Sequence, residues 1–235
     1  MQFIFTGHIA IVLVFLVGAG GYQYSEWLKI VETDFPAEGL IALIIGILLA
    51  FSRPTTLLRE PDQVYLLPLE SKMSQYFKKA LAWTFWSQVW IVAIVYIVSI
   101  PLIKAVTELT TLNIWSIFFI VIALKFVSVQ GEFSYRYSER GHYVWVDRLV
   151  RAIVCGVTVY MGLQMQLLLA LLVAVIGYVY VWVFRKKCAN EPVPYEHFVK
   201  LEQNRMMSFY RFANYFTDVP HLHGSIRRRA WLDWF

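Results

Sequence analysis

The chain alternates long apolar blocks with short connections that hold nearly all of its charges. A helix needs about 20 mostly apolar residues to cross the roughly 30 Å hydrocarbon core of a bilayer. Six segments fit this length pattern, and they cover residues 3–21, 36–51, 80–100, 111–130, 149–163 and 165–184. The predicted fold class is therefore all-α, a polytopic bundle of about six transmembrane helices.

The last two segments share one apolar run, residues 149–184. As a single helix this run would be about 54 Å long, at 1.5 Å per residue, which is too long for one crossing. The only polar break near its middle lies at residues 162–166 (GLQMQ). We therefore expect a hairpin of two short helices. The alternative is one tilted helix with an interfacial segment.

The basic residues fall on one side of this arrangement. The connection after the second helix, the connection after the fourth helix and the tail hold 18 of the 21 Lys and Arg residues. The connection after the fourth helix is expected to contain Arg136, Arg140, Arg148 and Arg151. The other connections hold only Lys29 and Lys104. The positive-inside rule places the basic connections and the tail in the cytoplasm.

Composition supports a membrane protein and argues against nucleic-acid binding. Hydrophobic residues make up 59% of the chain and charged residues 16%, against about 45–50% and about 25% in soluble domains. The net charge of +5 arises from basic residues at the ends of apolar blocks, not from one patch. No nucleic-acid partner is expected. Cys155 lies within an apolar block and is predicted to be a small core residue.

A search for catalytic motifs leaves no catalytic, cofactor-binding or metal-binding candidate that we favour. No glycine is followed by lysine, so the chain has no P-loop, and the H-E-x-x-H and G-x-S-x-G patterns are also missing. Asp218, His221 and His223 could bind a metal, but a cytoplasmic turn after Pro220 is the preferred interpretation. We expect a protein that is not an enzyme and has no cofactor.

Three polar residues inside the apolar segments form a possible intramembrane polar path: Lys125, Gln88 and Asn113. A lysine near a helix end can extend to the headgroups, which is the preferred interpretation of Lys125. The alternative is a side chain that faces a substrate path. Small residues spaced by four, Ala42, Gly46 and Ala50, predict close helix packing in the second segment.

The connection between the second and third helices contains an amphipathic stretch. Leu69, Met73, Tyr76 and Phe77 recur at helical spacing after Pro68. We expect a cytoplasmic helix whose apolar face must be covered. It could lie on lipid or bind in a groove on a soluble partner.

Two stretches resemble a known family. Residues 60–70 (EPDQVYLLPLE) resemble the first cytoplasmic loop of the Ecs-type ABC transporter permeases (the EcsB family), which include a streptococcal peptide-pheromone exporter subunit. Residues 211–220 (RFANYFTDVP), with the basic residues 227–229 and the following WLD, are similar to that family's signature after the sixth helix. Family members are longer, with further membrane helices and usually a longer cytoplasmic N-terminus. The chain is therefore expected to be the front part of a longer protein.

The resemblance implies a permease of the bacterial cell membrane that pairs with a separate, EcsA-like ATPase. It implies a permease domain over residues 1–186 and a cytoplasmic segment over residues 187–235 that leads toward another helix. The residues implied in coupling to the ATPase are Asp62, Leu66, Leu67, Pro68, Leu69, Glu70, Met73 and Phe77. Export of peptides or of substrates related to protein secretion is the implied activity.

Two other classes of function stay open. One is a non-transporting membrane scaffold or regulator of an intramembrane protease, which transport measurements with a labelled peptide would separate from an exporter. The other is an integral membrane enzyme, for which no constellation of residues stands out.

Overall fold

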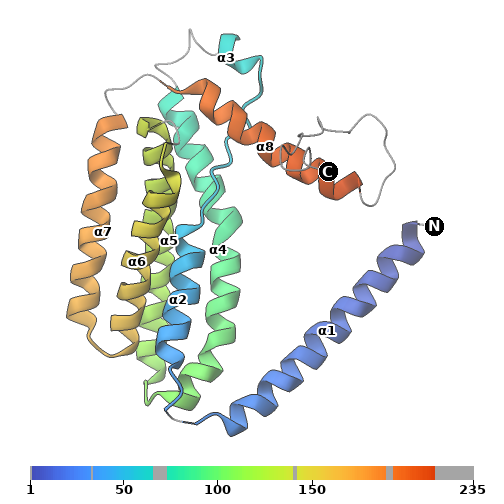
Figure 1. Ribbon diagram of the computed structural model, residues 1–235, viewed down its shortest axis with the longest axis vertical. Coiled ribbons are helices and arrows are strands. Elements are labelled where there is room, and N and C mark those ends of the chain that lie inside the picture. Colours follow the sequence, from blue (N-terminus) through green and yellow to red (C-terminus); the bar gives the residue numbers. More distant parts are fainter. Residues whose placement is uncertain (1, 33, 66–72, 140–141, 189–192, 215–235) are drawn as a thin grey trace, which may run out of the picture. The chain divides into compact units, whose positions relative to one another are not determined.

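The computed structural model describes residues 2–32, 34–65, 73–139, 142–188 and 193–214, and every regular element within these ranges is a helix (Figure 1). The helices are α1 (Gln2–Ile30), α2 (Ala37–Ala50), α3 (Asp62–Tyr65), α4 (Met73–Val106), α5 (Thr111–Glu139), α6 (Val144–Leu163), α7 (Leu167–Cys188) and α8 (Tyr195–Asn214). The all-α prediction is confirmed for this part of the chain.

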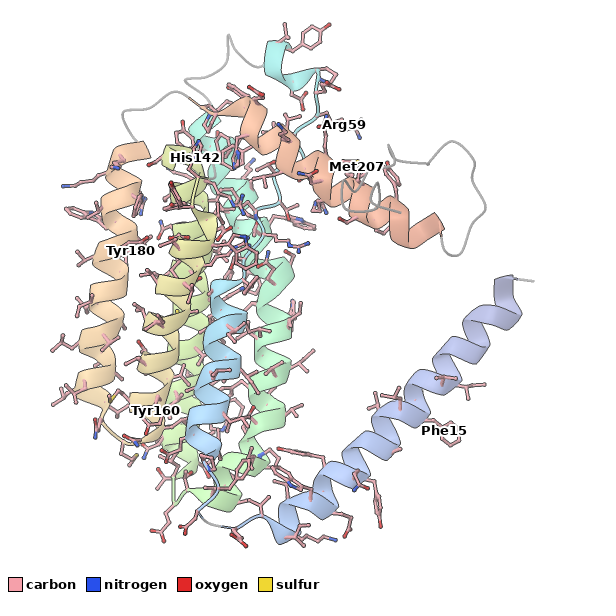
Figure 2. All side chains as sticks on the ribbon, viewed as in Figure 1. Phe15, Arg59, His142, Tyr160, Tyr180 and Met207 are labelled. Carbon is pink, nitrogen blue, oxygen red and sulfur yellow. The ribbon has the colours of Figure 1, made fainter. Side chains whose placement is uncertain are left out.

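Three helices in the described ranges are long and apolar enough to cross a membrane: Gln75–Val106, Thr111–Ser138 and Leu167–Lys187. Helix α2 is apolar but shorter. Each of the six predicted segments lies in a separate helix, while a crossing by all six stays a prediction. Apolar side chains such as Phe15, which is 74% exposed, project outward from α1 (Figure 2), as expected of a helix in contact with lipid.

The chain divides into two compact units. The first contains residues 1–52, 88–128 and 148–180, and the second contains residues 53–87, 129–147 and 181–235. The core of the first unit is an apolar cluster that combines α2, α4, α5 and α6 through residues such as Ile45, Val92, Ile117 and Val159. Cys155 is buried in the same cluster, so its prediction as a core residue is confirmed.

Helices α2 and α6 approach each other closely at two glycines. A Cβ atom added to Gly46 would lie 2.8 Å from the Cα of Gly156 and 2.9 Å from the carbonyl oxygen of Ala152. Ala42 and Ala50 are buried on the same helix. The packing role predicted for the stripe of small residues is therefore confirmed, and its partner is α6.

The break predicted within residues 149–184 is also confirmed. Helix α6 ends at Leu163 and α7 begins at Leu167. Met165 adopts a left-handed conformation with φ of 62°, and the backbone N–H of Gln166 donates to the carbonyl of Met161 (3.0 Å). This is the common way for a helix to end, because the reversal supplies donors to its last carbonyls.

Several predicted helix ends are wrong. Helix α5 runs on to Glu139 and α6 starts at Val144, so Arg136, Arg148 and Arg151 lie within helices and not in a long connection. Helix α4 also continues through Pro101 to Val106. Charged residues at the ends of membrane helices do not terminate them, and neighbouring groups in a bundle can satisfy the backbone that proline frees.

The amphipathic stretch around Met73 is not a separate helix. No glycine or proline interrupts residues 73–100, and α4 forms one continuous helix from Met73. Its first turns pack with α8, a helix that the sequence analysis did not predict. Their shared apolar cluster in the second unit includes Met73, Ala80, Phe133, Phe198 and Val199.

The glycine contact gives a prediction with an internal control. Gly46→Ala should destabilise the protein by about 1–3 kcal/mol, because the added methyl group meets backbone atoms that cannot move independently. The measurement is the thermal unfolding midpoint in detergent. Gly39→Ala is the control, since a Cβ there has no neighbour within 4 Å and alanine favours a helix. Equal midpoints for the two variants would contradict the close α2–α6 contact.

Candidate functional site

The C-terminal end of α2 lies where the chain leaves the first unit. A helix leaves its last four carbonyl groups without intrahelical donors, and its dipole makes this end negative. Only the Phe51 N–H continues the helical pattern, by donating to the carbonyl of Ile47 (3.0 Å). The carbonyls of Leu48, Leu49, Ala50 and Phe51 accept hydrogen bonds from side chains of other helices. Ser52 also donates locally, from its N–H to Ala50 (3.0 Å) and from its Oγ to Leu49 (3.4 Å).

Lys125 of α5 supplies two of these hydrogen bonds. Its Nζ donates to the carbonyl oxygens of Leu48 (3.3 Å) and Phe51 (3.4 Å), and to Ser52 Oγ (3.0 Å). The residue is only 1% exposed. A buried ammonium is costly unless it is paired or hydrogen-bonded, so these contacts account for the position of the lysine inside an apolar helix.

Ser128 and Arg151 complete the arrangement. Ser128 Oγ donates to the carbonyl of Leu49 (2.7 Å). Arg151 Nη1 donates to the carbonyl of Ala50 (3.3 Å), to the carbonyl of Ser128 (2.9 Å) and to Ser128 Oγ (3.0 Å). Arg151 is 4% exposed. We refer to Lys125, Ser128 and Arg151 together as the α2 cap.

The α2 cap draws on two helices that are distant in sequence. Lys125 and Ser128 share one face of α5 because they are three residues apart, and Arg151 comes from α6. Another α6 cation lies nearby, since the Arg148 guanidinium lies 5.2 Å from the centre of the Phe51 ring. Hydrogen bonds from charged donors contribute about 1.5–3 kcal/mol each. The cap therefore joins the end of α2 to both α5 and α6.

This geometry corrects the interpretation of Lys125. The expectation that it extends to the headgroups is wrong, because its ammonium group is enclosed and bound to α2. Asn113 lies 12 residues earlier on α5, about 18 Å away along the helix, where its Nδ2 donates to Met165 Sδ (3.1 Å). Gln88 lies on α4 and is partly exposed. A polar path through these three residues stays a prediction.

Comparison with known proteins gives the family. A model described as "Bacterial ABC transporter protein EcsB" matches residues 1–235. The chain belongs to the EcsB family. It is 32% identical over 234 residues to Protein EcsB of Bacillus subtilis (strain 168), and the match covers 99% of this chain and 57% of that protein. No solved structure matches the chain.

Membership of the EcsB family agrees with the resemblance seen at residues 60–70 and 211–220, and it associates the chain with an ABC transporter. The chain spans 57% of the length of the curated relative it matches. Residues 66–72, which include the predicted coupling residues Leu66, Leu67, Pro68, Leu69 and Glu70, lie outside the described residues. The coupling role of the whole set stays a prediction.

The structure places the remaining predicted coupling residues in different environments. Asp62 begins α3, and its Oδ2 accepts a hydrogen bond from the backbone N–H of Arg59 (2.7 Å). Met73 is buried, and the Phe77 ring packs against Tyr137 and Phe198 with ring centres 5.9 Å and 5.3 Å apart. The side chains of Met73 and Phe77 are thus covered within the same EcsB-family chain, in a cluster with residues of α5 and α8.

Sequence reasoning also missed how the segment after α2 is held in the second unit. The backbone N–H of Thr55 donates to Thr84 Oγ1 (3.0 Å), and that of Thr56 donates to Glu202 Oε2 (3.4 Å). The Tyr76 hydroxyl donates to the carbonyl of Thr56. Glu202 is 5% exposed and pairs with Arg205. The segment is therefore fixed to both α4 and α8.

The metal site considered in the sequence analysis is not tested. Asp218, His221 and His223 fall outside the described residues. Within the described ranges, no group of three or more His, Cys, Asp or Glu side chains is arranged to hold a metal ion.

Removal of the Lys125 charge should weaken the α2 cap. Lys125→Met keeps the length of the side chain but leaves carbonyls of α2 without a donor, which costs about 1–3 kcal/mol. We expect a lower thermal unfolding midpoint in detergent. Lys104→Met is the control, because Lys104 is exposed in the last turn of α4. An unchanged midpoint for Lys125→Met would contradict the role of the cap.

His197 on α8 gives a pH prediction. Burial, followed by the positive charges of Arg136, His142 and Lys200, lowers the pKa of this imidazole to about 4 from its ordinary 6.5. Between these values the unfolded chain binds the proton more readily, so the stability of α8 is full above pH 6.5 and decreases as the pH falls toward 4.

Hydrogen exchange of the α8 amides at pH 7 and pH 4.5, corrected for intrinsic exchange rates, measures this effect. His197→Gln should show a smaller loss of protection at pH 4.5 than the unaltered protein. An equal loss in both proteins would show that other groups cause the acid sensitivity.

Proposed function

We propose that this chain is part of the membrane permease of an ABC exporter, in which a separate ATPase subunit drives the export of peptides or of substrates related to protein secretion. Family membership supports an ABC transporter, and ATP hydrolysis by a separate subunit fits residues 1–235, which contain no P-loop. The single observation that carries the proposal is the α2 cap, because it binds the end of α2 to α5 and α6 and so allows the three helices to move together.

The proposed coupling follows the covalent path of the chain. Residues 53–58 leave the capped end of α2 and bind α4 and α8 through Thr55 and Thr56. A force applied to the cytoplasmic segment therefore reaches the end of α2. Since Lys125 and Arg151 bind that end to α5 and α6, the force moves three membrane helices together.

The proposed ATPase contact is α3 with the residues that follow it. Val64 and Tyr65 are 71% and 76% exposed and so are available for contact with a partner, and α3 contacts α8. Asp62 and residues 66–70 belong to this proposed surface. Met73 and Phe77 act by holding α4 against α8, because their side chains pack within the chain.

A binding experiment tests this surface. Val64→Asp combined with Tyr65→Asp should reduce co-purification of the cognate ATPase at least 10-fold, because two charges replace an exposed apolar contact. Tyr143→Asp is the control, since Tyr143 is exposed, lies in the connection between α5 and α6, and has φ of 50°, which aspartate tolerates. Phe77→Asp is unsuitable, because it would place a charge inside the aromatic cluster.

Two results would contradict the proposal. Co-purification that survives the double substitution would exclude α3 as the ATPase contact. ATP-dependent uptake of a labelled peptide into inverted vesicles, measured with the ATPase present, tests transport itself. If the unaltered protein binds the ATPase but transports no peptide, a non-transporting scaffold or protease regulator explains the protein better.

A further inference from the structure

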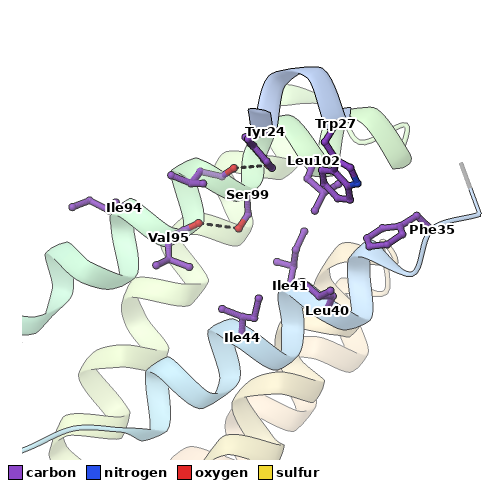
Figure 3. A pocket seen from close by; sticks show the side chains of 11 residues that line it. Tyr24, Trp27, Phe35, Leu40, Ile41, Ile44, Ile94, Val95, Ser99 and Leu102 are labelled. Atoms are coloured by element: carbon purple, nitrogen blue, oxygen red, sulfur yellow. Dashed lines mark hydrogen bonds between the residues drawn. The ribbon is translucent and has the colours of Figure 1, made fainter. Parts of the chain in front are cut away.

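The first unit contains an apolar cavity of about 340 Å³ between the end of α1, the start of α2 and the second half of α4 (Figure 3). Aromatic rings of Tyr24, Trp27 and Phe35 form one end. The rings support one another, with centres 6.1 Å apart for Tyr24 and Trp27 and 5.5 Å apart for Trp27 and Phe35. The volume lies at the low end of the roughly 300–1,000 Å³ range of small-molecule sites.

The walls offer almost no polar surface to a ligand. The two hydroxyl groups among the lining residues are already used within the protein. The Tyr24 hydroxyl donates to the carbonyl of Val98 (2.9 Å), and Ser99 Oγ donates to the carbonyl of Val95 (2.8 Å). Figure 3 shows both hydrogen bonds along the same wall. A ligand must therefore bind chiefly through apolar contact.

The apolar walls favour a hydrocarbon chain over a peptide as the ligand. A peptide carries backbone N–H and C=O groups, and each group that lacks a partner in an apolar site costs several kcal/mol. A hydrocarbon chain carries no such groups. The rim is apolar as well, because Leu40, Ile44, Ile94 and Val98 are each about half exposed on helices of the bundle.

We propose that this cavity holds a single acyl chain of a membrane lipid. The chain enters from the bilayer across the exposed apolar rim on α2 and α4. Tyr24 and Trp27 lie near the end of α1, beside the connection to α2, where aromatic side chains favour the membrane interface. The bound chain would contact all three helices and so hold the end of α1 against the bundle.

A phospholipid with a photoactivatable diazirine at the middle of one acyl chain tests the site. The probe is mixed into native membranes that contain the full-length protein, activated by light, and its adducts are mapped by mass spectrometry. In the unaltered protein we expect adducts on the cavity walls, at Tyr24, Trp27 and Ile44. Val98→Trp should reduce these adducts at least fivefold, because the indole fills the cavity from an exposed position.

Ile97→Trp is the matched control, because Ile97 is half exposed on the same turn of α4 and does not line the cavity. Ile44→Phe fills the cavity from α2 and should also reduce the adducts. It serves as the second variant if Val98→Trp fails to fold. Adducts that are spread evenly over all exposed apolar residues, and are unaffected by the filling variants, would overturn the proposal and indicate surface lipid only. Displacement of the probe by an apolar peptide would also overturn it, in favour of a peptide site.

Discussion

A helix that ends among other membrane helices has no water to donate hydrogen bonds to its last carbonyl groups. The packing of the first unit depends on how α2 obtains donors for these carbonyls. Lys125, Ser128 and Arg151 provide the missing donors. Both cations lie against the negative end of the α2 dipole, where positive charge is stabilising. The small residues of α2 permit this arrangement, because the contact at Gly46 and Gly156 brings α6 close enough for Arg151 to reach Ala50.

The α2 cap lies at the point where the chain passes from the first unit into the second. Residue 52 ends the first unit and residue 53 begins the second, so the capped end of α2 is where the membrane helices continue into the region proposed to meet an ATPase. A flexible end at this point would absorb motion. In the proposed coupling a hydrogen-bonded end transmits it, and the hydrogen bond from Thr56 to Glu202 fixes the first residues of the second unit to α8.

The sequence predicts the helices of this fold better than their ends. Apolar length alone locates α4, α5 and α7, and the polar residues 162–166 locate the hairpin. The ends differ because charge alone places Arg136 and Arg151 in a connection. Arg136 pairs with Glu132 on its own helix, and the buried Arg151 is satisfied by the carbonyl of Ala50 on α2. That partner comes from tertiary packing and leaves no local pattern. Helix α8 did have a signal, in Pro194 followed by Tyr195, Phe198 and Val199 at helical spacing.

The proposed coupling requires that α2 and α6 move as one body during the ATPase cycle. It is tested most directly by the distance between spin labels at Ile47 of α2 and Ile153 of α6, both exposed positions of the first unit. Cys155 and Cys188 are first replaced by alanine and serine, and the distance is measured by pulsed electron paramagnetic resonance with the ATPase bound. Rigid coupling of the two helices predicts the same narrow distance distribution without nucleotide and in an ATP-trapped state. A distribution that shifts or broadens on trapping would contradict it.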